Sequence, residues 1–206
     1  MPPRVRYKAV LFDLGNVLLA FDFTPAFRTL SRHTDLGPAE IEGYFIQSGL
    51  EVLYDGGKIT TRRFFAEVSK ALGLRIGYAR FRSIWNDIFT PIRPTIRILR
   101  RLKARGHRLV LISNTNEMHY RHIRATYDIL APFDRILLSY REKIRKPDPR
   151  IYRRACEACR ARPEEIFYID DRADLTQAAR ALGFKVHTYH NDPARLERDL
   201  RLAGLL

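Results

Sequence analysis

The chain has 206 residues, 46% of them hydrophobic, which suits one domain or one domain with an insert. No run approaches the roughly 18 apolar residues of a membrane-spanning helix, and no signal peptide precedes the first apolar run, so we expect a cytoplasmic protein. The net charge of +14 comes mostly from scattered arginines without a nucleic-acid-binding motif, which argues against nucleic acid as a partner.

The first apolar run predicts a strand that is buried on both faces. Residues 9–12 read Ala-Val-Leu-Phe without alternating polar residues, as in the strands of a parallel α/β sheet. Asp13 ends the run, and Leu14, Gly15 and Asn16 follow as a tight turn. Ligands bind at the carboxyl ends of such strands. A charge buried there costs several kcal/mol unless it is paired or bound to a metal, so Asp13 is a candidate functional residue.

The next part of the chain predicts a helical insert. Glycines and prolines divide it into pieces that carry apolar residues at helical spacing. We expect residues 20–93 to form a helical cap domain over the carboxyl edge of the sheet, and residues 1–19 and 94–206 to form the core domain. Thr60 or Thr61 is a suitable capping residue for the second predicted helix. The predicted helices are residues 39–47, 60–72 and 78–89.

Beyond the insert, predicted strands and helices alternate. Pro94 and Gly106 mark the start and the end of the first helix in this part. Such alternation makes the strands parallel and predicts a doubly wound α/β fold. The predicted strands are residues 108–112, 135–139, 166–169 and 185–188. The predicted helices are residues 95–105, 150–160 and 175–182.

Polar segments follow four of the five predicted strands, so they should converge on one edge of the sheet. Together they bring a carboxylate, a hydroxyl, a cation and an acidic pair to one place, which indicates an active site. The segments are residues 13–16, 113–116, 145–148 and 170–172.

These segments make the chain resemble the haloacid dehalogenase-like (HAD) hydrolase superfamily over essentially its whole length. Within it the chain looks most similar to subfamily IA with a helical C1-type cap, and to the bacterial α-D-glucose-1-phosphate phosphatase type. The resemblance implies a Rossmann-like core whose five strands, counted along the chain, lie in the order 5-4-1-2-3, with the cap inserted after the first. The matching residues are 12–17, 106–108, 113–116, 145–147, 151–152 and 170–171.

The residues at this edge suit the hydrolysis of a phosphate ester. Such an ester resists attack because the phosphoryl group is anionic and the leaving alkoxide is poor. Asp13 would be a carboxylate nucleophile, which divides the reaction into formation and hydrolysis of an acyl phosphate. Ser113 and the backbone N–H of Asn114 would bind phosphoryl oxygens where the turn opens into a helix. Lys146 would neutralise charge on the nucleophile and on the phosphate.

Oxygen ligands at the same edge predict a Mg²⁺ site. Asp170 and Asp171 would hold the cation beside Asp13, because two adjacent carboxylates otherwise repel each other. The resemblance implies that the backbone carbonyl oxygen of Gly15 is a further ligand of the cation. It also implies that Asp171 occupies the position of the family's main metal-binding motif. Either Asp170 or Asp171 could still be the residue that contacts the cation directly. The family usually has a further Asn or Asp four residues after Asp171, and Asp174, one position earlier, is a possible substitute.

Gly15 stands where most phosphatases of this superfamily carry an aspartate that protonates the leaving group and then activates water. Three explanations stay open. The substrate is a sugar phosphate whose anomeric oxygen leaves with little help, with Asp22 or Glu117 as a possible substitute acid. Alternatively, the enzyme attacks carbon, as 2-haloacid dehalogenases do without this aspartate and without a metal. As a third possibility, the protein is a weak catalyst that binds phosphate or a partner.

We therefore expect a Mg²⁺-dependent phosphatase that acts on a small phosphorylated metabolite, a sugar phosphate, through an aspartyl-phosphate intermediate. A monomer and a homodimer are both compatible with the sequence. We expect the cap to select the substrate. The candidate cap residues are Asp22, Glu51, Tyr54, Asp55 and Lys58.

Overall fold

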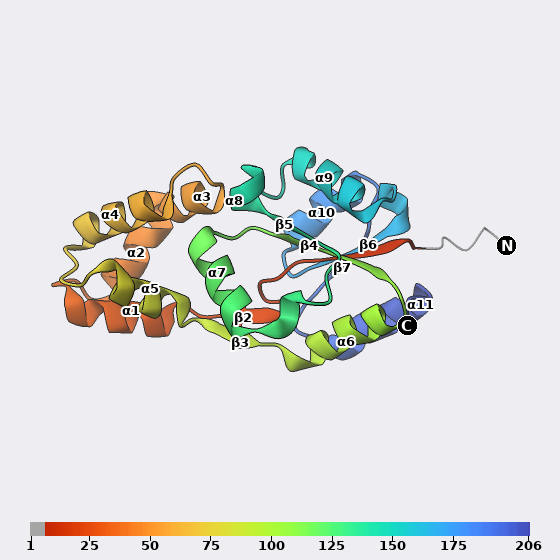
Figure 1. The fold of residues 1–206 in the computed structure, drawn as a ribbon, viewed down its shortest axis with the longest axis horizontal. Helices are drawn as coiled ribbons and strands as arrows, with labels where there is room; N and C mark the ends of the chain where they lie inside the picture. The colour runs from red at the N-terminus through yellow and green to blue at the C-terminus, as the bar shows by residue number, and fades with distance from the viewer. Residues whose placement is uncertain (1–6) are drawn as a thin grey trace.

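The computed structural model describes residues 7–206, and a five-stranded parallel sheet lies at its centre (Figure 1). The strands lie in the order β5-β4-β1-β6-β7, which is the predicted order 5-4-1-2-3 taken from the opposite edge. This confirms the doubly wound α/β fold. Residues 1–6, where we expect no signal peptide, lie outside the described residues. The parallel strands are β1 (Ala9–Phe12), β4 (Arg108–Ser113), β5 (Arg135–Leu138), β6 (Ile166–Asp170) and β7 (Lys185–Thr188).

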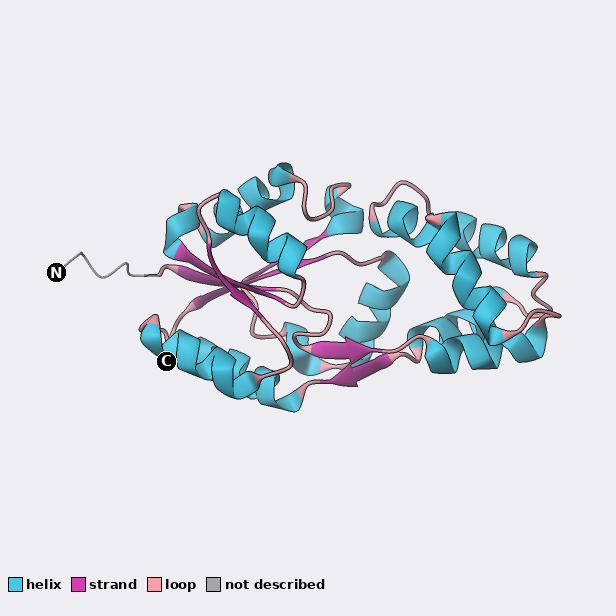
Figure 2. Ribbon diagram, turned by 180° about the vertical axis from the view of Figure 1, so that it is seen from behind, coloured by secondary structure: helices cyan, strands magenta, loops and turns pink. Residues whose placement is uncertain are grey.

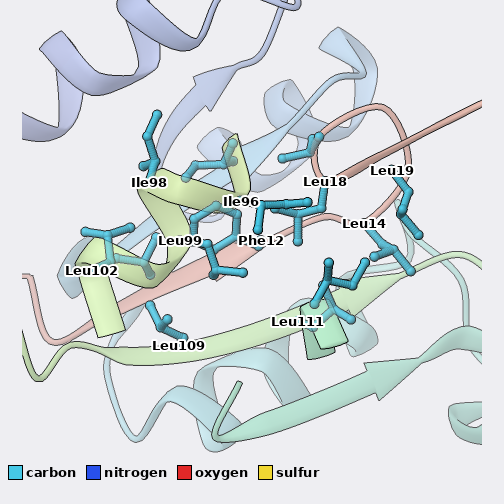
Figure 3. Close-up of a cluster of buried hydrophobic side chains, with 14 of the residues drawn as sticks. Phe12, Leu14, Leu18, Leu19, Ile96, Ile98, Leu99, Leu102, Leu109 and Leu111 are labelled. Carbon is cyan, nitrogen blue, oxygen red and sulfur yellow. The ribbon is translucent and has the colours of Figure 1, made fainter. Parts of the chain in front are cut away.

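The central strand β1 is buried on both faces because each of its side chains is apolar. Leu11 pairs in register with Val110 of β4 and with Tyr168 of β6. Successive side chains of a strand point to opposite faces, so Phe12 joins one buried cluster whereas Leu11 joins another. Figure 3 shows the Phe12 cluster, in which leucines and isoleucines of the neighbouring elements surround the ring.

Helices cover both faces of this sheet (Figure 2). α6, α7 and α11 contribute to the Phe12 cluster, and α9 and α10 contribute to the Leu11 cluster. The helices predicted over 95–105 and 150–160 begin earlier, because Pro94 and Pro149 fit the first helical turn. No helix within residues 7–206 is long and apolar enough to cross a membrane. These helices are α6 (Arg93–Ala104), α7 (Glu117–Thr126), the short α8 (Ser139–Glu142), α9 (Pro149–Cys159), α10 (Ala173–Ala181) and α11 (Pro193–Leu202), with 3₁₀ turns at Asp128–Leu130 and Pro163–Glu165.

The insert between β1 and β4 is helical, as predicted, and has an apolar core of its own. Trp85 is fully buried there, with its ring centroid 4.6 Å from that of Phe45 and 5.6 Å from that of Phe81. The Thr60 side chain accepts the backbone N–H of Arg63 and so caps α4. The insert helices are α1 (Thr24–Leu30), α2 (Pro38–Ser48), α3 (Leu50–Asp55), α4 (Thr61–Leu72) and α5 (Tyr78–Asn86), with a 3₁₀ turn at Ser31–His33.

Two short antiparallel strands join the insert to the sheet, and they are not part of the sequence prediction. β2 (Leu19–Phe21) pairs with β3 (Phe89–Pro91), and we call this pair the β2–β3 ribbon (Figure 2). The helix predicted over 78–89 is therefore wrong at its end. α5 stops at Asn86 because the chain then turns into the ribbon.

Gly57 follows α3 at a place without room for a side chain. Its φ is +63°, a left-handed conformation that glycine adopts without strain. A Cβ on Gly57 would lie 2.1 Å from the carbonyl oxygen of Tyr140, in α8 of the core. We therefore predict that Gly57→Ala lowers the free energy of unfolding by about 2–4 kcal/mol, through backbone strain and overpacking, as measured by urea denaturation.

Gly43→Ala is the matched control for this substitution. Gly43 lies within α2 and has open space around its Cβ position. Alanine should therefore stabilise the helix there by about 0.5–1 kcal/mol. Identical unfolding midpoints for Gly57→Ala and the unchanged protein would contradict the close approach between the insert and the core.

Candidate active site

The floor of the candidate site is a buried ion-pair network at the ends of strands. Asp13 directly follows β1 and is 7% exposed, and its backbone N–H donates to the carbonyl oxygen of Ile169 at 2.8 Å. The Nζ atom of Lys146 lies 2.8 Å from Asp13 Oδ1 and 2.6 Å from Asp170 Oδ2. One ammonium group therefore bridges two carboxylates that are far apart in the sequence.

Asp170 is the more deeply held of the two neighbouring aspartates. Its side chain is completely buried at the end of β6. Besides the bond from Lys146, Asp170 Oδ2 accepts the hydroxyl of Tyr168, and Oδ1 accepts the backbone N–H of Arg172 at 2.9 Å. These donors orient the carboxylate and leave it little freedom to move.

Asp171, in contrast, lines the cavity and is only partly buried. Its Oδ2 atom accepts a bond from Asn16 Nδ2 at 3.2 Å. One carboxylate oxygen each of Asp13, Asp170 and Asp171 lies within 4.8 Å of the other two. Burial raises the pKa of Asp13 to about 7, although the charge of Lys146 lowers it, and burial also raises the pKa of Asp171. Converging carboxylate oxygens suit a hard divalent cation, which would favour the ionised form of Asp13 and Asp171.

Asn114 connects the end of β4 to the segment that carries Lys146. Its Nδ2 donates to the carbonyl oxygen of Lys146 at 3.0 Å, and its Oδ1 accepts the backbone N–H of Lys146 at 2.9 Å. Sequence reasoning assigned only the backbone N–H of Asn114 a role and missed this link, because no spacing pattern relates residues 114 and 146. Asn114 and the neighbouring Ser113 both line the cavity.

A cavity of about 340 Å³ contains this floor. One part of its lining, which we call the apolar wall, comes from the β2–β3 ribbon and the residues next to it. Another part, which we call the polar wall, comes from α3 and from the core segments that contact α3. The apolar wall is Leu19, Phe21, Phe23, Ile88 and Phe89. The polar wall is Glu51, Asp55, Asn116 and Arg145.

Gly15 lines this cavity next to the aromatic ring of Phe21. Its φ is not positive, so the backbone does not require glycine there. A Cβ on Gly15 would lie 3.0 Å from Cε1 of Phe21, closer than carbon atoms normally approach. The ring of Phe21 therefore restricts the space into which a side chain at position 15 would extend.

Three carboxylates that the sequence offered as substitutes lie elsewhere. Asp22 is exposed and accepts a backbone N–H at the start of α1. Glu117 accepts the hydroxyl of Thr61 at 2.7 Å and lines a different cavity. Asp174 is exposed and pairs with Arg172 at 2.7 Å. None of the three carboxylates lines the cavity that holds the floor.

The polar wall also holds the insert against the core. Ser139, at the start of α8, accepts the backbone N–H of Thr115 at 2.9 Å and donates to the carbonyl oxygen of Asp55. Asn116 Nδ2 donates to Asp55 Oδ1 at 3.0 Å. The end of α3 is thus attached by hydrogen bonds to the segment after β4 and to α8.

A model of the haloacid dehalogenase-like hydrolase family matches residues 7–183. The chain belongs to this family. The match confirms the predicted resemblance at the level of the superfamily, and it makes the chain a HAD hydrolase.

Among three relatives of this HAD hydrolase, two match it over most of its length, and the third matches less than half of it. The phosphoglycolate phosphatase of Nitrosospira multiformis is 30% identical over 188 residues, 87% of this chain and 81% of that protein. The (S)-2-haloacid dehalogenase 1 of a Pseudomonas species is 33% identical over 83 residues, 40% of this chain and 37% of that protein. The HAD enzyme BT-2542 of Bacteroides thetaiotaomicron, solved in complex with magnesium and inorganic phosphate, is 26% identical with a TM-score of 0.81, over 92% of this chain and 98% of that one.

Lys146 stabilises the floor of this HAD hydrolase electrostatically. Although burial opposes the shift, Asp13 and Asp170 raise the pKa of Lys146, so its ammonium group stays charged. We predict that Lys146→Met lowers the free energy of unfolding by about 3–5 kcal/mol, because two buried carboxylates lose their shared cation. Chemical denaturation at pH 8 without divalent cations measures the loss.

Lys58→Met serves as the control, since Lys58 is exposed in the loop after α3. It removes the same charge and should change the free energy of unfolding by less than about 0.5 kcal/mol. If both variants unfold at the denaturant concentration of the unchanged protein, the bridge does not stabilise the fold.

Proposed function

We propose that the protein is a Mg²⁺-dependent phosphatase that hydrolyses a sugar phosphate through an aspartyl-phosphate on Asp13. The observation that carries this proposal is the convergence of one carboxylate oxygen each of Asp13, Asp170 and Asp171 within 4.8 Å of one another on the cavity floor, where Lys146 pairs with the first two. Family membership and the similarity to a phosphatase along most of the chain support it.

The carboxylates would hold the magnesium ion together with the backbone carbonyl oxygen of Gly15. All of these donors are oxygen atoms, which Mg²⁺ prefers. Asp171 lines the cavity, whereas Asp170 is enclosed by its donors, so we assign the direct contact to Asp171 and the support beneath it to Asp170. Bound there, magnesium neutralises negative charge on the phosphoryl group. The complex of BT-2542 with magnesium and inorganic phosphate supports a magnesium ion in this phosphatase site.

Asp13 would attack the phosphorus atom. Lys146 binds Asp13 Oδ1, so Oδ2 is the oxygen available for attack. The hydroxyl of Ser113 and the backbone N–H of Asn114 would bind phosphoryl oxygens, and Lys146 would also reduce the repulsion between carboxylate and phosphate. Water would then hydrolyse the acyl phosphate and regenerate Asp13. The side chain of Asn114 positions Lys146 for both steps.

The walls of the cavity favour a sugar as the leaving group. A sugar ring has apolar C–H faces that pack on aromatic rings, and hydroxyls that bind polar groups. The apolar wall and the polar wall offer both kinds of contact in one cavity. An anomeric oxygen is also a better leaving group than an ordinary alkoxide, which compensates in part for the acid absent at Gly15. We therefore assign residues 20–93 to a cap domain that selects the substrate, residues 1–19 and 94–206 to the core domain, and the chain to the α-D-glucose-1-phosphate phosphatase type.

We predict that Asp13→Asn lowers kcat at least about a thousandfold, because an amide oxygen does not replace the carboxylate as nucleophile. Phosphate release from a series of sugar phosphates, nucleotides and phospho-acids at saturating Mg²⁺ measures the loss. Circular dichroism should show the fold of the unchanged protein.

Metal removal gives the complementary control. EDTA should abolish phosphate release by the unchanged protein, and added Mg²⁺ should restore it. Halide release from 2-haloacids that persists in EDTA would instead favour the dehalogenase activity of the Pseudomonas relative. Phosphate binding without turnover of any ester would favour a weakly active binding protein.

Gly15 generates a further prediction about the leaving group. In the double variant Gly15→Asp/Phe21→Ala, the new carboxyl has the space that the Phe21 ring restricts. We predict that its kcat for a primary-alcohol phosphate rises about tenfold to a hundredfold relative to its kcat for an anomeric phosphate, because the poorer leaving group gains more from a general acid.

Two single variants complete this comparison. Phe21→Ala alone opens the same space without supplying an acid, so it should not change the ratio of the two kcat values. Gly15→Asp alone should show a smaller gain than the double variant, because the ring must first move. A double variant that slows both esters equally would show that the aspartate does not reach the leaving group.

A further inference from the structure

Two carboxyl groups of the polar wall lie one helical turn apart on α3, and only one of them has partners. Asp55 accepts a bond from Asn116 at 3.0 Å and lies 4.0 Å from Arg145. Glu51 makes no hydrogen bond and no ion pair with any of residues 7–206, although it lines the active-site cavity. The insert therefore presents one unpartnered carboxyl group to whatever enters this cavity.

The surroundings of Glu51 leave this wall with an excess of negative charge. Burial raises the pKa of Glu51 to about 7, Asp55 raises it further, and Arg145 lowers it. Burial raises the pKa of Asp55 to about 6. Above pH 8 both carboxyl groups are ionised, and they share a single neighbouring guanidinium, which lies beside Asp55. The net charge of these three groups is then −1.

A carboxylate in this position discriminates between leaving groups. It accepts hydrogen bonds from hydroxyl groups at little cost. It repels a second carboxylate, and the repulsion is strong in a partly buried site because the surrounding dielectric constant is low. A ligand that brings its own carboxylate to the polar wall would also leave Glu51 without a hydrogen-bond donor.

We propose that Glu51 is a specificity-determining residue that admits phosphate esters with a hydroxylated leaving group and excludes those whose leaving group carries a carboxylate. This inference rests on the proposed phosphatase function and names the substrate class of the same site. Glu51 acts on binding of the leaving group, whereas Asp13 and Lys146 act on the phosphoryl group.

Two esters of equal carbon number test the inference. Phosphoglycolate and 2-hydroxyethyl phosphate differ in that a carboxylate replaces a CH₂OH group. The ratio of their kcat/KM values is measured at pH 8.5 and saturating Mg²⁺ for the unchanged enzyme and for Glu51→Gln. We expect the unchanged enzyme to prefer the hydroxylated ester. Glu51→Gln should shift the ratio about tenfold toward phosphoglycolate, mainly through a lower KM for that ester.

Glu42→Gln is the matched control, because Glu42 is an exposed glutamate of α2 outside the cavity lining. It removes one negative charge from the insert and should leave the ratio unchanged. Glu51→Gln should fold with a Tm at or above that of the unchanged protein, since it removes a partly buried charge that has no partner among residues 7–206. Glu51→Ala, which also removes the charge, should shift the ratio in the same direction.

A failure of the inference about Glu51 and a failure of the proposed phosphatase function would give different results. An unchanged enzyme that prefers phosphoglycolate, or a Glu51→Gln variant that changes both esters equally, would overturn the role of Glu51 while leaving the phosphatase assignment intact. Failure of the unchanged enzyme to hydrolyse any phosphate ester would count against the phosphatase assignment itself.

Discussion

The ammonium group of Lys146 between Asp13 and Asp170 is the interaction on which the site depends. It lies at distances of 2.8 and 2.6 Å from two carboxylates that a protein interior does not otherwise tolerate side by side. Three separate parts of the chain must meet for this contact to form. The parallel order of β4, β1 and β6 brings two of them together, and the side chain of Asn114 fixes the backbone of the third. The charges of the active site are therefore paired only when the strands of the sheet are in this order.

The insert is attached to the core by contacts beyond the two chain segments that connect them. Asp55 at the end of α3 bonds to residues that follow β4 and β5 through both its side chain and its backbone. Gly57 approaches the backbone of α8 so closely that no side chain fits between them. The polar wall is thus made of residues from both the insert and the core. The groups that would contact a leaving group are consequently positioned by the same contacts that position the insert.

The sequence predicted those features that follow from local patterns. An apolar run ending in Asp13, repeated strand–helix alternation and polar residues after strand ends were enough to predict a parallel sheet and to bring residues 13, 113, 146, 170 and 171 to one edge, whereas the order of the strands was predicted from the resemblance to the HAD superfamily. Features that depend on contacts between distant residues were missed. The β2–β3 ribbon pairs residues on either side of the insert, and no local pattern in three-residue strands indicates it. Glu117 was a possible substitute acid whose carboxyl group the sequence could not place, and in the structure it bonds to Thr61 and lines a different cavity.

The position of Phe21 over Gly15 has a consequence for how this chain can change during evolution. A single substitution at position 15 introduces a side chain into space that an aromatic ring already restricts. A single substitution at position 21 removes an apolar contact and supplies no acid. The step at position 21 alone therefore offers no advantage, the step at position 15 alone offers only part of it, and the two together would supply a proton donor with room beside the nucleophile. Because the effect of a substitution at one of these two positions depends on the residue at the other, a lineage with Gly15 and Phe21 is expected to retain both. Its descendants are then expected to change their substrate through substitutions in the cap and not at position 15.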